Sequence, residues 1–154
     1  MRGIEAKDYE VFKKLFDQAF FEYLEFLRQE NPQHYMKELK ERREITRSGF
    51  NFYLRTGSTL VVEEDGKVIG YVASQKVPSL HGVDLWIEYI VIQKEFRRRG
   101  IGLALLQKLI EYATSASIDR IYAFINPDNE PSMRLHSRAG FKIENWKIAL
   151  CETK

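Results

Sequence analysis

The chain has 154 residues, of which 44% are hydrophobic and 30% are charged, and its formal net charge is +2 at pH 7. This length fits one domain with a sizeable core, and the small net charge argues against a nucleic-acid-binding protein. From this length we expect residues 1–154 to form a single domain. A single cysteine, Cys151, excludes an internal disulfide and a CxxC metal site, so we expect no metal.

The first third of the sequence predicts a short strand followed by two helices. Residues 4–6 suit the strand, and the apolar residues between positions 8 and 28 recur at helical spacing. Asn31 and Pro32 break this first helix. Opposite charges four residues apart indicate a second, solvated helix over residues 33–48.

The middle of the sequence predicts an antiparallel meander of three strands. Residues 59–63 and 68–73 are apolar runs joined by an Asp-Gly turn, which is a strong hairpin signal. Residues 78–82 are expected to form a loop, and residues 83–92 a third strand.

The last third predicts alternating helices and strands. A helix starts at Gly100–Gly102 and ends near Thr114, and residues 118–125 form a strand. Asn129 is placed as the N-cap of a further helix that ends before Gly140. Residues 141–150 close the sheet, so the expected fold is α/β (α+β), a mixed, mostly antiparallel sheet flanked by helices in the order β-α-α-β-β-β-α-β-α-β.

The most informative stretch runs from Glu88 to Leu106, where an apolar strand leads into three arginines, two glycines and a helix. Glycines let the backbone approach a ligand, and the first N–H groups of a helix favour an anion. A Walker loop would need Gly-Lys-Ser/Thr, and a dinucleotide fingerprint would need a third glycine at Leu105. A plain turn would explain the glycines but not the arginines, so the stretch predicts a site for a phosphate-bearing cofactor.

Two motifs resemble those of a known family. The segment Arg97-x-x-Gly100-x-Gly102 is similar to the acetyl-CoA loop Q/R-x-x-G-x-G/A of the GNAT N-acetyltransferase superfamily. Residues 129–141, Asn-Glu-Pro-Ser-Met-Arg-Leu-His-Ser-Arg-Ala-Gly-Phe, resemble its second signature, N-x-x-A/S-x-x-L-Y/H-x-x-x-G-F. The expected element order also matches, although residues 1–58 match only coarsely.

The resemblance implies acetyl-CoA as the cofactor and direct transfer to an amine in a ternary complex. It implies that the strand backbone pairs with the pantetheine arm, that the loop N–H groups hold the pyrophosphate, and that the N–H of Ile92 polarises the thioester carbonyl. The cofactor-binding residues so implied are Ile90, Val91, Ile92, Arg97, Arg98, Arg99, Gly100, Ile101, Gly102, Leu103 and Asn129.

Glu88 and His136 are the candidate catalytic residues. Glu88 lies in an otherwise apolar strand beside the expected thioester and could deprotonate the amine, or else face solvent or pair with an arginine. His136 occupies the position where most relatives carry a tyrosine that protonates the leaving thiolate, and it could instead only pack. Ribosomal-protein N-terminal acetylases carry glutamate at the position of Phe124, which argues against that subgroup.

The acceptor is expected to be a small-molecule amine, with a protein N-terminus or lysine, or a CoA-binding regulatory role without turnover, as alternatives. Aromatic residues of the first helix and the acids Glu22 and Glu25 could line its pocket, or else belong to the core and the solvated surface. A homodimer through the sheet edge is possible. No apolar run approaches the roughly 20 residues that cross a bilayer, and no signal-peptide pattern is present, so we expect a cytoplasmic protein.

Overall fold

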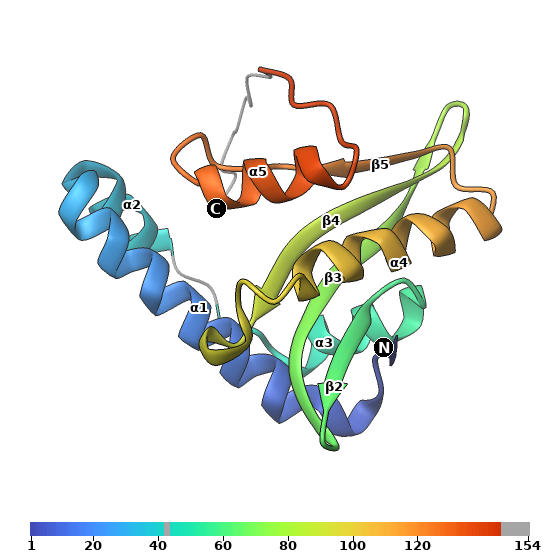
Figure 1. The fold of residues 1–154 in the computed structure, drawn as a ribbon, viewed down its shortest axis with the longest axis horizontal. Helices are drawn as coiled ribbons and strands as arrows, with labels where there is room; N and C mark the ends of the chain where they lie inside the picture. The colour runs from blue at the N-terminus through green and yellow to red at the C-terminus, as the bar shows by residue number, and fades with distance from the viewer. Residues whose placement is uncertain (42–43, 146–154) are drawn as a thin grey trace.

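The structure is a computed structural model that describes residues 1–41 and 44–145. Its described part forms a five-stranded sheet in the order β1-β2-β3-β4-β5 (Figure 1). The strands are β1 (Arg2–Gly3), β2 (Leu60–Glu64), β3 (Lys67–Ser79), β4 (Gly82–Ile92) and β5 (Arg120–Ala123). The helices are α1 (Tyr9–Glu30), α2 (Pro32–Glu41), α3 (Arg47–Thr56), α4 (Ile101–Ser115) and α5 (Glu130–Arg138). The sheet is antiparallel except for the parallel pair β4–β5, which confirms the predicted fold class.

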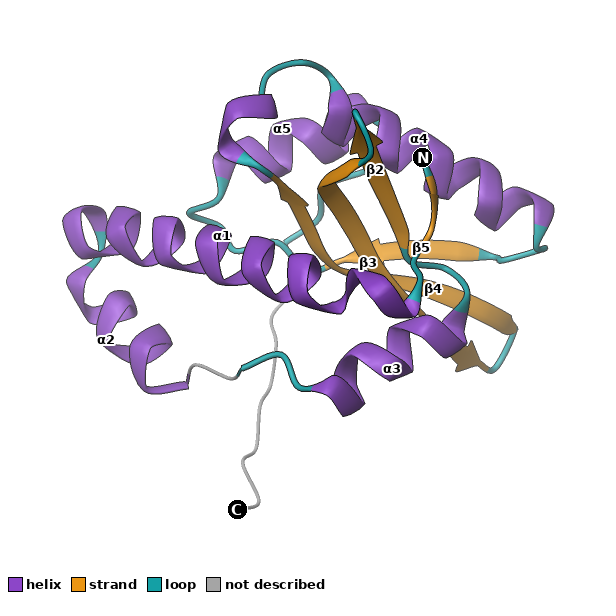
Figure 2. Ribbon diagram, turned by 90° about the horizontal axis from the view of Figure 1, so that it is seen from below, coloured by secondary structure: helices purple, strands orange, loops and turns teal. Residues whose placement is uncertain are grey.

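Helices cover both faces of the sheet, with α1 and α3 on one side and α4 on the other (Figure 2). On the α4 face, Leu105 shares a core cluster with Leu85 of β4. On the opposite face, Phe12 of α1 and Phe50 of α3 share a cluster with Tyr71 of β3. No helix within the described ranges is both long and apolar enough to cross a membrane.

The first strand lies two residues before its predicted position, whereas the long first helix differs from expectation only at its ends. The strand lies at Arg2–Gly3 rather than at residues 4–6. Asp8 accounts for the shift, because its carboxylate accepts hydrogen bonds from the backbone N–H of Glu5 at 2.8 Å and from Arg2 at 2.7 Å, which closes a 3-10 turn. The predicted break at Asn31 is confirmed, since α1 ends at Glu30 and α2 begins at Pro32.

The prediction of one helix over residues 33–48 is wrong. Helix α2 ends at Glu41, and a separate helix, α3, begins at Arg47. Thr46 is the N-cap of α3, where its hydroxyl accepts a hydrogen bond from the N–H of Gly49 at 3.0 Å. Gly57 ends the helix with a left-handed φ of 66°. Thr46 and Gly57 are both typical cap residues in the sequence, but the repeating charge pairs favoured one continuous helix across Thr46.

Two further predictions concern the strands. The loop expected at residues 78–82 is reduced to the turn at Leu80 and His81, because β3 continues to Ser79 and β4 starts at Gly82. The closing strand expected at residues 141–150 is not seen over its described part, residues 141–145, which is irregular. Residues 146–150 of that prediction lie outside the described residues.

Candidate active site

A β-bulge at Glu88 separates β4 from its parallel neighbour. In the β3–β4 pairing Ala73 lies opposite Tyr89 and Ser74 opposite Ile87, so Glu88 has no partner residue on β3. The pairing of β4 with β5 also stops at Ile87. Because a bulge bends its strand, the two strands diverge beyond this point, as Figure 1 shows.

This divergence leaves the end of β4 with a free backbone edge. The N–H of Gln93 donates to the carbonyl of Ile69 on β3 at 2.8 Å. Since backbone groups alternate sides along an antiparallel strand, those of Ile90 and Ile92 point away from β3. The carbonyl of Ile92 accepts a hydrogen bond from Arg97 Nε at 2.8 Å, which agrees with that direction. The edge next to β5 can therefore pair with an extended ligand.

A cavity of about 910 Å³ lies at this edge, between α1, β4, the segment after β5 and α5. Among the residues that line it are the following predicted site residues: Glu88, Ile90, Val91, Ile92, Arg97, Arg98, Gly100, Ile101, Gly102, Leu103, Asn129 and His136. Arg99 is the exception among the predicted site residues, because it does not line the cavity. Its guanidinium pairs with Glu64 of β2 at 2.7 Å and lies over the ring of Phe96.

The anion-binding end of the cavity is the start of α4. Gly100 is the N-cap of this helix, with a left-handed φ of 80° and no side-chain cap. The N–H groups of the first turn therefore lack side-chain partners. Gly102 allows α4 and α5 to approach, because a Cβ at this position would lie 3.2 Å from Leu135 Cδ2. The helix dipole and these N–H groups favour a negatively charged group here.

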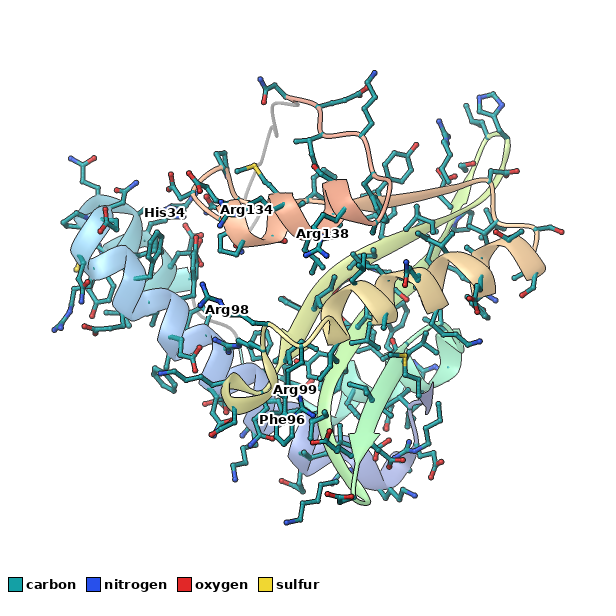
Figure 3. The ribbon with its side chains drawn as sticks, in the orientation of Figure 1. His34, Phe96, Arg98, Arg99, Arg134 and Arg138 are labelled. Atoms are coloured by element: carbon teal, nitrogen blue, oxygen red, sulfur yellow. The ribbon has the colours of Figure 1, made fainter. Side chains whose placement is uncertain are left out.

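The arginines at this end have different environments. Arg97 is held by Glu22 of α1 through an ion pair and by the carbonyl of Ile92. Within the described part of the chain, no partner is seen for Arg98 or for Arg138 of α5, and both line the cavity. Figure 3 shows them on opposite sides of the opening between the loop and α5. Arg138 was missed by the sequence analysis, although it lies inside the second motif, and it adds positive charge to the opposite wall.

Glu88 is held by two neutral donors rather than by an arginine. The hydroxyl of Tyr53 donates to one carboxylate oxygen, and the side-chain amide of Gln75 donates to the other. Burial and the neighbouring carboxylate raise the pKa of Tyr53, so its hydroxyl stays protonated. A carboxylate has about four lone-pair sites, so Glu88 can still accept a proton or a hydrogen bond from a ligand.

His136 is held as a neutral imidazole. Its side chain is 2% exposed, and Nδ1 lies 2.8 Å from the carbonyl oxygen of Ser132. Because a carbonyl only accepts, Nδ1 carries the hydrogen and Nε2 presents its lone pair. Nε2 is buried without a partner among the described residues. Burial lowers the pKa of His136 below its ordinary value of 6.5, against the opposing hydrogen bond to Ser132. The structure thus favours His136 as an acceptor, whereas a proton donor would need the charged form.

The burial of His136 predicts an acid-sensitive stability. Because its folded pKa is depressed, the unfolded chain takes up the proton first as the pH falls through 6.5, and the stability of the native state decreases there. We expect the midpoint of thermal unfolding to fall more between about pH 7.5 and about pH 5.5 in the wild type than in His136→Gln. His81→Gln, in the exposed β3–β4 turn, is the control and should follow the wild type. Equal pH dependence in all three proteins would contradict a buried neutral imidazole.

A polar network beside the cavity links α1, α2 and the segment after β5. Asn126, which follows β5, donates to the hydroxyl of Tyr23 at 2.6 Å. His34 of α2 lies 3.1 Å from Glu38 and 3.6 Å from Asp128. Burial raises the pKa of Tyr23 to about 12, so this hydroxyl also stays protonated. Over the described residues, no group of histidine, cysteine and acidic side chains is arranged to hold a metal ion.

Asn129 fulfils the predicted capping role, since its side chain accepts a hydrogen bond from the N–H of Ser132 at 3.1 Å. An open mixed sheet whose β4 and β5 separate beside a helix N-terminus leaves room for an extended ligand with an anionic end. Residues 12–141 match the Acetyltransferase (GNAT) family, and the chain belongs to this family. The prediction made from the two motifs is confirmed.

Individual relatives agree with this assignment. An L-methionine sulfoximine/L-methionine sulfone acetyltransferase of Pseudomonas aeruginosa is 33% identical over 97 residues, which cover 61% of this chain and 56% of that protein. The chain thus spans little more than half the length of this relative. The L-amino acid N-acetyltransferase AaaT of Escherichia coli is 26% identical over 94% of this chain and 83% of its own length. The solved structure of a putative acetyltransferase from Agrobacterium tumefaciens has the same fold, with a TM-score of 0.73, 18% identity and 98% coverage of both chains.

Proposed function

We propose that this protein transfers an acetyl group from acetyl-CoA to the primary amine of a small molecule. The observation that carries the proposal is the continuous path along β4, from Glu88 through the free edge at Ile90 and Ile92 to the N-terminus of α4. The pantetheine arm of CoA is extended and can pair with a strand edge, and its pyrophosphate suits a helix N-terminus flanked by Arg98. The residues present therefore fit this cofactor.

Each residue of the path has a role in this proposal. Bound acetyl-CoA supplies the thioester carbonyl that the amine attacks. Glu88 removes the proton that the amine must lose, while Tyr53 and Gln75 fix its orientation. The N–H groups of Ile90 and Ile92 point toward the ligand side. The resemblance implies the N–H of Ile92 as the group that polarises the carbonyl, but we propose the N–H of Ile90, because it is nearer to Glu88.

His136 takes a different role from the one expected from the sequence. His136 lines the cavity while its Nε2 is buried without a partner among the described residues, so we propose that the neutral imidazole shapes the wall against which the cofactor lies. The thiolate then leaves without a proton from the imidazole, or takes one from water. Asn129 contacts the pantetheine arm while it caps α5.

The acceptor class is supported by the relatives, whose names specify amino acids and methionine sulfoximine as substrates. We extend from them only the general class, a small-molecule amine. A single domain, a cytoplasmic location and a homodimer remain predictions.

The test is transfer of radiolabelled acetyl from acetyl-CoA to a panel of small amines, amino acids and peptides. We expect acetylated small amines and free CoA in equal amounts. Labelled peptides with no labelled small amine would contradict the proposed acceptor class. If CoA binds by calorimetry but no acceptor is labelled, the transferase activity itself is refuted.

Arg98 and Arg99 provide a matched test of the cofactor site. Arg98 lines the cavity, whereas Arg99 pairs with Glu64 on β2. A charge-assisted contact to phosphate is worth roughly a tenfold or larger change in affinity, so we expect Arg98→Ala to weaken CoA binding by about that factor. Arg99→Ala should change the dissociation constant less than about threefold, the range of a surface ion pair. Calorimetric titration with CoA measures both, and equal losses would contradict the assigned difference.

A further inference from the structure

We infer that the acceptor is a primary amine attached to an apolar, preferentially aromatic, group and that it carries no carboxylate next to the amine. This inference rests on the proposed function and narrows its substrate class. Three observations lead to it: the aromatic walls around Glu88, the sign of the charges near Glu88, and the length of β4 that separates Glu88 from the nearest cations of the loop.

Aromatic side chains form the cavity wall near Glu88. Tyr89 follows Glu88 on β4, and Phe124 follows the end of β5, beside the point where the two strands separate. Phe124 is 59% exposed and is held edge-on by Trp86 at a ring distance of 5.2 Å. Tyr89 is held in the same way by Phe16 of α1 at 4.9 Å. Large apolar side chains that are ordered but left open to a cavity indicate a surface for an apolar ligand group.

Phe26 of α1 adds a third exposed aromatic ring to the cavity lining. Aromatic faces attract an ammonium group as well as an apolar body, because the ring carries negative charge on its face. A desolvated position among such rings also favours the neutral amine over the ammonium. The same walls therefore suit both the substrate before deprotonation by Glu88 and the nucleophile after it.

The charges around this part of the cavity are negative. The described lining residues from β4 and from residues 123–129 include Glu88 and Asp128 but no lysine or arginine. The cations of the described lining come from the loop before α4 and from the last turn of α5, and they are Lys94, Arg97, Arg98 and Arg138. Arg97 is already engaged by Glu22 and by the carbonyl of Ile92.

Distance keeps the loop cations away from an α-carboxylate. Four residues of extended strand, from Glu88 to Ile92, span about 13 Å, and the loop cations follow Ile92. In an α-amino acid the carboxylate carbon lies within about 2.5 Å of the amine nitrogen. With the amine at Glu88, that carboxylate would lie beside another carboxylate and away from the loop cations, which is unfavourable. The substrate class thus departs from the amino acids named for the relatives.

The experiment compares 2-phenylethylamine with L-phenylalanine, which differ only in the carboxylate, and with L-phenylalanine amide, in which the carboxylate is neutralised. Release of CoA thiol from acetyl-CoA gives kcat/KM for each amine. We expect 2-phenylethylamine to exceed L-phenylalanine by about 100-fold or more, because the site leaves the carboxylate unpaired, and the amide to recover part of the loss. L-phenylalanine equal to or better than 2-phenylethylamine would overturn the inference.

Variants of two exposed aromatic residues test the aromatic wall. Phe124→Ala should lower kcat/KM for 2-phenylethylamine about tenfold and leave that for propylamine nearly unchanged, because only the aryl group loses its contact. Tyr122→Ala, on β5 outside the cavity lining, is the matched control and should leave both values unchanged. Equal losses for both amines in Phe124→Ala would overturn the aromatic contact. Acetyl transfer that prefers amino acids overturns this inference alone, whereas no transfer to any amine, with CoA still bound, overturns the proposed function and the inference together.

Discussion

Glu88→Gln is expected to lower kcat by about 10²- to 10⁴-fold, the usual contribution of a positioned general base, while the affinity for CoA stays close to that of the wild type. The amide keeps the size of the carboxylate but cannot accept the proton of the amine. The variant keeps the proposed cofactor site, because the part expected to hold the pyrophosphate begins beyond Ile92 and the backbone of β4 is the same. Initial rates with saturating acetyl-CoA and 2-phenylethylamine measure kcat, and calorimetry measures CoA binding.

Glu111→Gln is the matched control for this variant. Glu111 is an exposed residue of α4 that pairs with Lys108 at 2.8 Å and does not line the cavity. It should leave both kcat and CoA binding unchanged. If Glu88→Gln keeps more than about a tenth of the wild-type kcat, a group other than Glu88 accepts the proton, since a general base contributes about 100-fold or more. A parallel loss of CoA affinity would instead mean that the substitution distorts β4.

Glu88 shows how far the sequence can predict this site. A carboxylate inside an apolar strand is visible in the sequence, and the motif after it fixes its place relative to the cofactor loop. Its two partners, Tyr53 and Gln75, are 35 and 13 residues away, and the β-bulge that exposes it is a property of the β3–β4 pairing. No local pattern encodes those three features, so the sequence is equally compatible with an arginine partner, which Glu88 does not have among the described residues.

Local sequence signals predicted the helix boundaries of the second motif, but they did not predict the protonation state of its histidine. The cap at Asn129 and the stop before Gly140 follow from residue types at fixed positions, and both are confirmed. The protonation of His136 depends instead on its burial, on the carbonyl of Ser132 and on the edge-on ring of Phe141. These contacts form only when α5 and the segment after it fold together, so the acid role inferred from the family position did not take them into account.

The three arginines that drew attention to the loop also look alike in the sequence. Their roles divide because of two acids that are remote in the chain: Glu22 is 75 residues from Arg97, and Glu64 is 35 residues from Arg99. The fold brings each acid to one guanidinium and leaves Arg98 open to the cavity. The positive charge of the loop was predictable from the sequence. Which of the three arginines stays available to a phosphate group was not.

Phe12→Ala should have the largest effect on stability, about 3–5 kcal/mol, as is typical for a buried phenylalanine. Phe12 is 1% exposed, and its ring stacks on Tyr71 at 3.9 Å and meets the edge of Phe50 at 5.3 Å. Removing it leaves a cavity between α1, α3 and β3. For a chain of this size we expect the midpoint of thermal unfolding to fall by roughly 6–20 °C, which calorimetry measures.

The control is Phe21→Ala on the same helix, where the side chain is 52% exposed and the expected change is within about 0.5 kcal/mol.

Phe12 also contacts Tyr53, at a ring distance of 5.9 Å, and Tyr53 donates to Glu88. Phe12→Ala should therefore lower kcat even at temperatures where the variant is fully folded, because the carboxylate of Glu88, which we propose as the base, loses its orientation. A folded Phe12→Ala protein with wild-type kcat would show that the aromatic cluster supports the fold without positioning Glu88. A small loss of stability would contradict the tight packing around Phe12. The loss is small only where the neighbouring side chains can relax into the cavity that the substitution leaves.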